Sequence, residues 1–147
     1  MIPTYRITTA AVIYDPQKGF LLGKRSQKED TVPGLWSLPA GKLETGGPAH
    51  DVLENNLRKE VREEIGVEMA DLEYFDSHMW TDKNPYKITI VFATQIASGE
   101  PKAMDPEEVS EIRWFKLEEV EGLNLPPHVF RVLQKANKKN RVSASRR

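Results

Sequence analysis

Runs of hydrophobic residues, separated by short polar segments rich in Gly and Pro, predict several β-strands in the first third of this chain of 147 residues. Residues 4–15, TYRITTAAVIYD, and 20–25, FLLGKR, are rich in β-branched, aromatic and aliphatic side chains, and the DPQKG between them is typical of a turn. The two segments therefore predict an early β-hairpin. A further short strand is predicted at 34–41, GLWSLPAG, and Pro39 is expected to end it.

The second half of the chain has the same kind of pattern. A pair of strands is predicted at 67–82, VEMADLEYFDSHMWTD, and at 86–98, YKITIVFATQIAS, because DKNP between them favours a turn. Residues 110–117, SEIRWFKL, predict another strand, and LEEVEGL at 117–123 predicts a helical turn.

The helical period of hydrophobic residues occurs in two places. The first helix is predicted at 52–65, with Asp51 as its N-cap, Glu54 completing a capping box and Gly66 in the left-handed conformation after its end. Its apolar stripe, at 100° per residue, consists of Leu53, Leu57, Val61 and Ile65. The second helix is predicted at 126–139, PPHVFRVLQKANKK, where Pro occupies the first turn.

This order of elements predicts the α+β class, with a mixed β-sheet sandwiched between α-helices. The length is suited to one domain, which we place at residues 1–140, and the basic segment 141–147 is expected to be a disordered tail.

Composition narrows the classes of protein. The chain contains no Cys, which excludes a disulfide framework, a thiolate zinc site and a Cys nucleophile, and which is compatible with a reducing cytoplasm. No apolar run is long enough to span a membrane, and the N-terminus MIPTYRITT lacks a signal-peptide pattern. We therefore expect a cytoplasmic protein without a membrane partner. The formal net charge of -1 identifies no partner.

The first predicted helix carries an unusual group of acids. Glu60, Glu63 and Glu64 lie together along the edge of its apolar stripe, where each like-charge contact costs about 0.2–0.5 kcal/mol. A hard divalent cation, Mg²⁺ or Mn²⁺, would relieve this repulsion, because such cations prefer oxygen ligands and complete their shells with substrate phosphates. The alternative is a solvated acidic face of an ordinary helix, on which Glu54 and Arg58 form a favourable pair.

The surrounding pattern favours the metal site, because residues 59–67, KEVREEIGV, resemble the second half of the Nudix box, G-x5-E-x7-R-E-U-x-E-E-x-G-U, where U is a bulky aliphatic residue. Lys59 replaces the Arg of the box. Outside the box, GLWSLPAGKLETG and SEIRWFKLEEV also resemble segments of the Nudix family, so that the resemblance extends from about Ile7 to Leu133. The resemblance implies a Nudix fold.

The first half of the box departs from the family pattern. Gly41 is the candidate for its first glycine, but Gly47 stands where a Glu is expected, and eleven residues separate Gly47 from Lys59, instead of seven. The extra residues precede the helix and lengthen a loop, where insertions are tolerated. Glu44 and Asp51 are nearby carboxylates that could take over part of the lost role, while Lys59 keeps a positive charge without the bidentate fork of Arg.

The resemblance implies a function and roles for the box residues. It implies hydrolysis, by water, of a pyrophosphate bond in a nucleoside diphosphate linked to another moiety, with Mg²⁺ or Mn²⁺ as cofactor. Glu60 and Glu64 would be metal ligands, and Glu63 would be a third ligand or the general base. The backbone carbonyl of Gly41 would join the metal shell, with Glu44 close enough in sequence to help.

Other candidates lie outside the box. The family implies a further metal-binding acid from a later loop, for which Glu107, Glu108 and Glu111 are alternatives. Lys24 and Arg25, at the end of a predicted strand, are candidates for phosphate contacts. The candidates for contact with a base are Trp80, Tyr86 and His78, beside the predicted DKNP turn.

Several alternatives remain open at this point. A P-loop nucleotidase is excluded because the motif G-x-x-x-x-G-K-[ST] is absent, and an isopentenyl diphosphate isomerase is excluded because it relies on a Cys. A Nudix-like module that binds a nucleotide without cleaving it is the second hypothesis, supported by Gly47. A nucleic-acid role, supported only by the basic C-terminal segment, ranks third. The nucleotide substrate is open, as is the oligomeric state, with a homodimer among the expectations.

Overall fold

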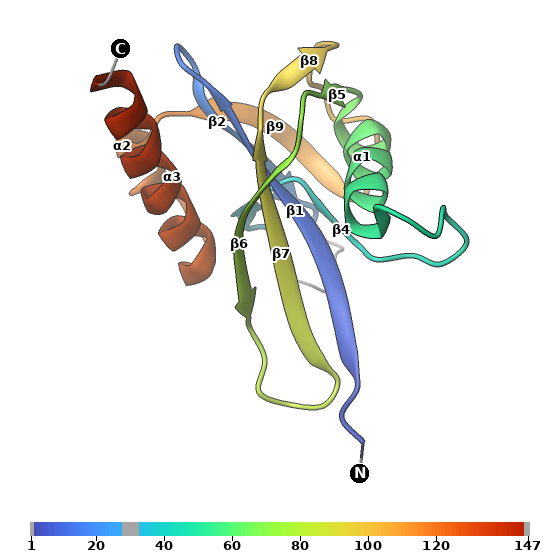
Figure 1. The fold of residues 1–147 in the computed structure, drawn as a ribbon. Helices are drawn as coiled ribbons and strands as arrows, with labels where there is room; N and C mark the ends of the chain where they lie inside the picture. Colours follow the sequence, from blue (N-terminus) through green and yellow to red (C-terminus); the bar gives the residue numbers. More distant parts are fainter. Residues whose placement is uncertain (1, 28–32, 146–147) are drawn as a thin grey trace.

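The computed structural model describes residues 2–27 and 33–145, and its centre is a seven-stranded mixed sheet (Figure 1). The strands of this sheet are β1 (Tyr5–Asp15), β2 (Gly19–Arg25), β3 (Trp36–Ser37), β4 (Ala40–Lys42), β6 (Glu73–Met79), β7 (Tyr86–Thr94) and β9 (Val109–Phe115). A separate two-stranded sheet consists of β5 (Glu68–Met69) and β8 (Ile96–Ser98). The helices are α1 (Val52–Ile65), α2 (Leu117–Val120) and α3 (Pro127–Ser145).

The long strand β1 organises the sheet. The order is β3-β2-β1-β7-β6, with β4 also paired to β1 and β9 also paired to β2. The pairing of β1 with β7 is parallel, with Tyr5 opposite Tyr86 at one end and Ile13 opposite Thr94 at the other, whereas the other pairs are antiparallel. The predicted mixed sheet is therefore confirmed.

The two long helices lie on opposite faces of the sheet (Figure 1). The apolar stripe of α1 packs on the face that carries alternate residues of β1, and its cluster includes Ala11, Ile13, Leu57, Val61, Ile65 and Phe92. The intervening β1 residues point to the other face, where α3 packs, and that cluster includes Ala10, Val12, Phe115, Val129, Val132 and Leu133. The predicted sandwich of a sheet between helices is confirmed.

Three predicted strands are each divided in the structure. The segment 34–41 forms β3 and β4, because the chain changes partner at Pro39, whose carbonyl accepts a hydrogen bond of 2.9 Å from the amide of Ala11. Segment 67–82 is divided in the same way into β5 and β6, and segment 86–98 into β7 and β8. The first strand of the one, β5, pairs with the last strand of the other, β8, in the small second sheet.

The ends of two helices differ from the prediction. Helix α1 has the predicted bounds, and Gly66 has the expected left-handed conformation, with φ 71°. The predicted capping box is wrong, because Asp51 is itself left-handed, with φ 51°, and its side chain makes no capping hydrogen bond. Helix α3 continues to Ser145, so residues 141–145 extend the helix where the sequence predicts a tail, since no Pro or Gly interrupts the segment. Residues 146–147 lie outside the described part.

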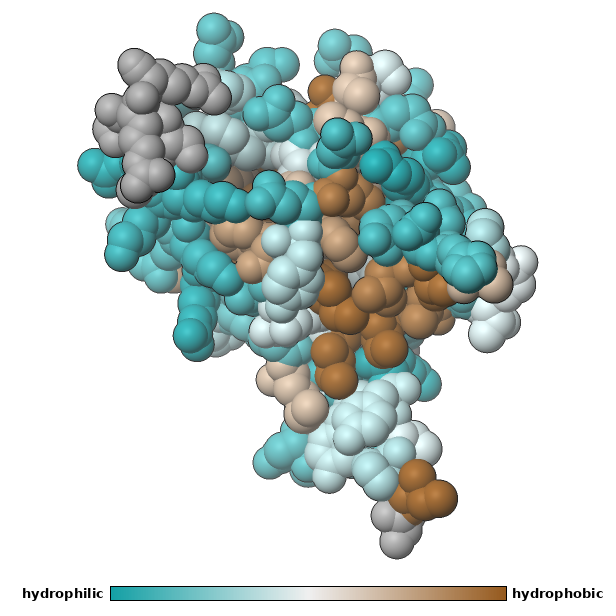
Figure 2. All heavy atoms as spheres, in the orientation of Figure 1, coloured by the Kyte–Doolittle hydropathy of each residue, from teal (hydrophilic) through white to brown (hydrophobic). Residues whose placement is uncertain are grey.

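Hydrophilic residues cover most of the side of the molecule drawn in Figure 2, while hydrophobic residues gather beside the lower half of β1, below α1. None of the helices in the described part of the chain is both long enough and apolar enough to cross a membrane.

Candidate functional site

Helix α1 directs two of its three box acids into the protein and the third toward solvent. Glu60 and Glu64 are only 8% and 4% exposed, whereas the side chain of Glu63 is 58% exposed. The helical period explains the difference, because Glu60 and Glu64 flank the buried positions Val61 and Leu57, and Glu63 is turned away from that stripe.

Glu60 packs against the backbone of Gly41 in β4. A Cβ atom at Gly41 would lie 2.2 Å from Cγ of Glu60, so this approach of helix to strand requires glycine. Burial, with a hydrogen bond shared with Glu44 and the negative charges of Glu44 and Glu63, raises the pKa of Glu60 to about 7. Its Oε1 is buried without a hydrogen-bond partner in the structure.

Glu64 is the most buried acid of the helix. Burial and the negative charge of Glu108 raise the pKa of its carboxyl to about 8, against the opposing effects of the Arg25 guanidinium and the backbone amide of Ala40. Glu108 is held near this position by the segment before β9, where its carbonyl accepts a hydrogen bond of 2.9 Å from the amide of Ser26. Of the three acids proposed for the late loop, Glu108 therefore approaches the box helix.

The loop between β4 and α1 is tied to the helix at two points. Lys59 Nζ lies 2.5 Å from Glu44 Oε2, and it also lies 3.8 Å from Glu63 Oε1. Asn56, buried in α1, accepts a hydrogen bond of 3.1 Å from the amide of Glu44 and donates hydrogen bonds to Thr9 and Lys42. Sequence reasoning missed Asn56. A signal for it was present, because Asn56 is a polar residue four positions before Glu60 and therefore lies on the same side of the helix.

The candidate metal ligands do not form a preassembled cluster. Among residues 2–27 and 33–145, no three acids or histidines are already grouped at metal-ligand spacing. The donor set nevertheless fits Mg²⁺ or Mn²⁺, because two buried carboxylates, one with an orphaned oxygen, lie against the strand that contains Gly41. These ions complete their shells with water and substrate phosphates.

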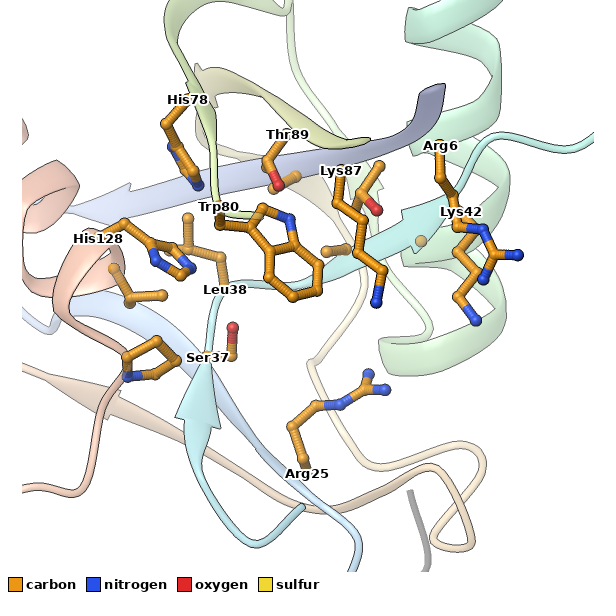
Figure 3. Close-up of a pocket in the computed structure, with 16 residues that line it drawn as sticks. Arg6, Arg25, Ser37, Leu38, Lys42, His78, Trp80, Lys87, Thr89 and His128 are labelled. Carbon is orange, nitrogen blue, oxygen red and sulfur yellow. The ribbon is translucent and has the colours of Figure 1, made fainter. Parts of the chain in front are cut away.

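A pocket opens on the other side of β4 (Figure 3). One wall is aromatic and apolar, with the Trp80 and His128 rings stacked at 6.3 Å and His78 4.6 Å from His128. The side of the pocket away from His78 and His128 carries the cationic side chains of Arg6, Lys42 and Lys87, and Arg25 reaches in from β2. The remaining lining residues are Thr8, Ala10, Ser37, Leu38, Ala40, Gly41, Thr89, Pro126 and Val129. Arg25 links the pocket to the box helix, because it also acts on Glu64.

Three predicted site residues lie elsewhere. Lys24 does not line the pocket, since the alternation along β2 turns its side chain away from the side on which Arg25 lies. Tyr86 packs its ring 5.6 Å from that of Tyr5, also outside the pocket. Glu111 forms an ion pair with Arg113.

Glu111 is therefore not brought to the box helix. On β9 it shares a face with Arg113 and Phe115, which packs in the cluster under α3, whereas Ile112 and Trp114 pack toward α1. Glu107 is exposed, and its amide donates a hydrogen bond of 3.2 Å to Asp105.

Sequence reasoning missed four ionisable residues of the pocket: Arg6, Lys42, Lys87 and His128. A signal for Arg6 was present, because alternation along β1 puts it on the same face as Thr8 and Ala10. That Lys42 and Lys87 lie beside Arg6 depends on the register between strands far apart in sequence, and no pattern along the chain indicates it.

Comparison with known proteins agrees with this geometry. The NUDIX domain family matches residues 4–136. The NAD-capped RNA hydrolase NudC of Pseudomonas putida (strain W619) is 30% identical over 128 residues, which cover 87% of this chain and 43% of that protein. The NAD-capped RNA hydrolase NudC of Pseudomonas aeruginosa (strain LESB58) is 37% identical over 87 residues, which cover 59% of this chain and 29% of that protein. The chain thus spans less than half the length of these curated relatives.

Solved structures show the same fold. The MutT protein from Methanosarcina mazei Go1 superposes with a TM-score of 0.78 at 26% identity, over 95% of this chain and 98% of that chain. The MutT NUDIX hydrolase from Burkholderia pseudomallei superposes with a TM-score of 0.76 at 24% identity, over 90% of this chain and 98% of that chain. The resemblance inferred from the box is thereby confirmed: this chain belongs to the Nudix family.

Proposed function

We propose that this chain hydrolyses a pyrophosphate bond in a nucleotide derivative, with Mg²⁺ or Mn²⁺ bound at the inner side of α1. The observation that carries the proposal is the contact of two buried carboxylates, Glu60 and Glu64, with the strand β4 that also borders a cation-lined pocket. Two acids with raised pKa values beside a pocket are typical of a site that binds a ligand or catalyses a reaction.

Different residues would bind the metal and the substrate. Glu60 and Glu64 would hold the metal, and Glu108 stands near enough to Glu64 to act on it electrostatically. A bound divalent ion neutralises phosphate oxygens and lowers the pKa of a coordinated water. Arg25 extends toward the pocket, where it would bind a phosphate of the substrate, and Trp80 with His128 offers a surface for a base.

Glu63 is the accessible acid of the box, and its position supports a role as general base. Its carboxylate is exposed and 3.8 Å from Lys59, so it stays available to accept a proton from water outside the buried pair. The contact of Lys59 with Glu44 also supports catalysis over the alternative of a non-catalytic binding module, because the loop that lacks the box Glu at Gly47 is still fastened to the helix.

The test is phosphate and pyrophosphate release from a panel of nucleoside triphosphates, nucleotide sugars, ADP-ribose, dinucleoside polyphosphates and NAD derivatives, with and without Mg²⁺ or Mn²⁺. Products are treated with pyrophosphatase or alkaline phosphatase, so that every mode of cleavage is detected. The NAD derivatives are included because the curated relatives are NAD-capped RNA hydrolases.

Glu64→Gln and Glu63→Gln are expected to lower metal-dependent kcat by at least about 100-fold, which exceeds the usual cost of losing a residue that only supports a ligand. Glu118→Gln, on an exposed position of α2, is the matched control and is expected to retain wild-type turnover. Tight binding of a nucleotide by the wild type without turnover under either metal would contradict hydrolysis and support the binding module.

A further inference from the structure

Three cationic side chains form a patch on the pocket face of the sheet. Arg6 of β1 is the direct neighbour of Lys87 of β7, and two residues further along β1, Thr8 is the direct neighbour of Lys42 of β4. Side chains at alternate strand positions point to one face, so the three cations converge from three adjacent strands. Figure 3 shows them along the side of the pocket away from His78 and His128. We name Arg6, Lys42 and Lys87 the sheet-face triad.

The triad has no anionic counterpart in the pocket. The described residues that line the pocket include no Asp or Glu. Within residues 2–27 and 33–145, neither Arg6 nor Lys42 forms an ion pair, and Lys87 Nζ instead lies 4.6 Å from the centroid of the Trp80 ring. Three like charges on adjacent strands repel one another, and an anion in the pocket would be attracted by all of them.

The triad lies on the other side of β4 from the box acids. The Cβ direction of Gly41 points at Glu60, and successive residues of a strand point to opposite faces, so Lys42 points away from α1. A phosphate held by a metal at Glu60 and Glu64 would lie on the α1 side, where Arg25 is the basic group that reaches Glu64. The triad is therefore positioned for a different anionic group of the same ligand.

We propose that the pocket selects pyrophosphate-linked nucleotides that carry an additional phosphate monoester, which the sheet-face triad binds. This proposal rests on the proposed function, because it assigns the scissile pyrophosphate to the box acids. A pyrophosphate diester brings about one charge per phosphorus, whereas a phosphate monoester adds about 1.5 to 2 negative charges and three acceptor oxygens. Three converging donors match such a group, and the aromatic wall with Trp80 matches the base beside it.

The test compares substrates that differ by one phosphate. NADPH and NADH differ by a ribose 2′-phosphate, and coenzyme A and dephospho-coenzyme A differ by a ribose 3′-phosphate. The two pairs therefore show whether the pocket recognises a monoester at the 2′ or at the 3′ position. For the preferred pair, kcat/KM is expected to be at least about 10-fold higher for the phosphorylated member, the range that charge-assisted hydrogen bonds provide.

Arg6→Gln, Lys42→Gln and Lys87→Gln are each expected to reduce that preference by at least about 5-fold. Lys138→Gln, which removes an exposed charge of α3 outside the pocket, is the matched control and is expected to keep the preference. Thermal unfolding of each variant checks that the fold is retained.

Binding separates the failure of this proposal from the failure of the proposed function. The dissociation constants of the same four compounds are measured on the Glu64→Gln protein, in which no turnover is required. A triad-dependent preference in binding supports the selection of a monoester even if no substrate is cleaved. Equal affinity for both members of each pair, or an equal loss on both members in the triad variants, would overturn it.

Discussion

Lys59 Nζ and Glu44 Oε2 lie 2.5 Å apart, and this contact joins the box helix to the loop in which the family pattern is broken. Gly47, which stands at the position of the missing Glu, is exposed and has nothing within 4 Å of its Cβ direction. The loop acid that engages the basic residue of the box is therefore Glu44, while Glu63 of the helix lies farther away, at 3.8 Å. Lys at this position, where the family has Arg, suits this arrangement. The contact involves a single carboxylate oxygen, which the point charge of an ammonium group can bind without the bidentate fork of a guanidinium.

The first prediction concerns this contact. Glu44→Gln is expected to raise the concentration of Mg²⁺ or Mn²⁺ needed for half-maximal activity by about 10-fold, because the loop next to Glu60 loses its tie to α1 and residues that support metal ligands typically contribute this much. The melting temperature is expected to stay near that of the wild type, since both side chains are about half exposed. A metal titration of activity and a thermal scan measure the two quantities.

Its control is Glu68→Gln, which removes a different exposed partner of α1, the one that pairs with Arg62. This change is expected to leave the metal requirement unaltered. The double exchange Glu44→Lys with Lys59→Glu restores the pair with opposite polarity, and it is expected to recover part of the loss. An unaltered metal requirement in Glu44→Gln would show that the contact is only a surface ion pair.

The second prediction concerns stability and pH. Folding raises the pKa of Glu60 from 4.5 to about 7 and that of Glu64 from 4.5 to about 8. For carboxyls with raised pKa values, the stabilising contribution is complete below pH 4.5 and is lost as the pH rises through 7 and 8. In EDTA the melting temperature is therefore expected to fall between pH 6 and pH 9, and a saturating divalent metal is expected to raise it more at pH 9, because metal binding requires the deprotonated acids.

The matched comparison for pH is the double variant Glu60→Gln and Glu64→Gln. It removes the two titrating groups and is expected to be more stable than the wild type at pH 9 in EDTA by at least about 2 °C, since one kcal/mol corresponds to roughly 2–4 °C at this size. Its melting temperature is expected not to respond to the metal. If the melting temperatures of the wild type and the double variant in EDTA changed with pH in the same way, the two acids could not be the cause of the change.

The third prediction separates two aromatic residues that sequence reasoning treated alike. Trp80 stacks with His128 in the pocket, whereas Tyr86 packs against Tyr5 outside it. Trp80→Ala is expected to raise KM for a nucleotide substrate by about 5-fold or more, the usual value of a base–aromatic stack, with a smaller change in kcat. Tyr86→Ala is expected to leave KM unchanged, and equal effects in steady-state kinetics would show that Trp80 acts through folding alone.

The sequence predicts the elements better than their partners. The bounds of α1, the mixed sheet and its two layers of helices follow from periodicity, because the apolar stripe of α1 and the alternation along β1 are local patterns. The sequence predicts a strand end at Pro39, but it does not predict that the chain continues as β4 with another partner, nor the division between β7 and β8, since both arise where a strand exchanges one neighbour for another. Such exchanges depend on contacts that are distant in sequence.

The same distinction applies to the site. Glu60 and Glu64 are recognisable in the sequence because the box spacing places them on one side of a helix. The division between these two buried acids and the exposed Glu63 depends on how α1 sits on the sheet, and the approach of Gly41 to Glu60 depends on the pairing of β4 with β1. The pocket residues were mostly missed, because six strands and the start of α3 contribute between one and three residues each.

The last prediction uses two glycines of the box region as a matched pair. Gly41→Ala places a Cβ 2.2 Å from Cγ and 2.6 Å from Oε2 of Glu60, so the carboxylate must leave its position against β4. Activity and the metal-dependent rise in melting temperature are both expected to be lost, by about 100-fold in kcat/KM, as for loss of the ligand itself. Gly47→Ala meets nothing within 4 Å and is expected to keep both properties. If Gly41→Ala retained wild-type metal response while folded, Glu60 could not be the ligand that this contact positions.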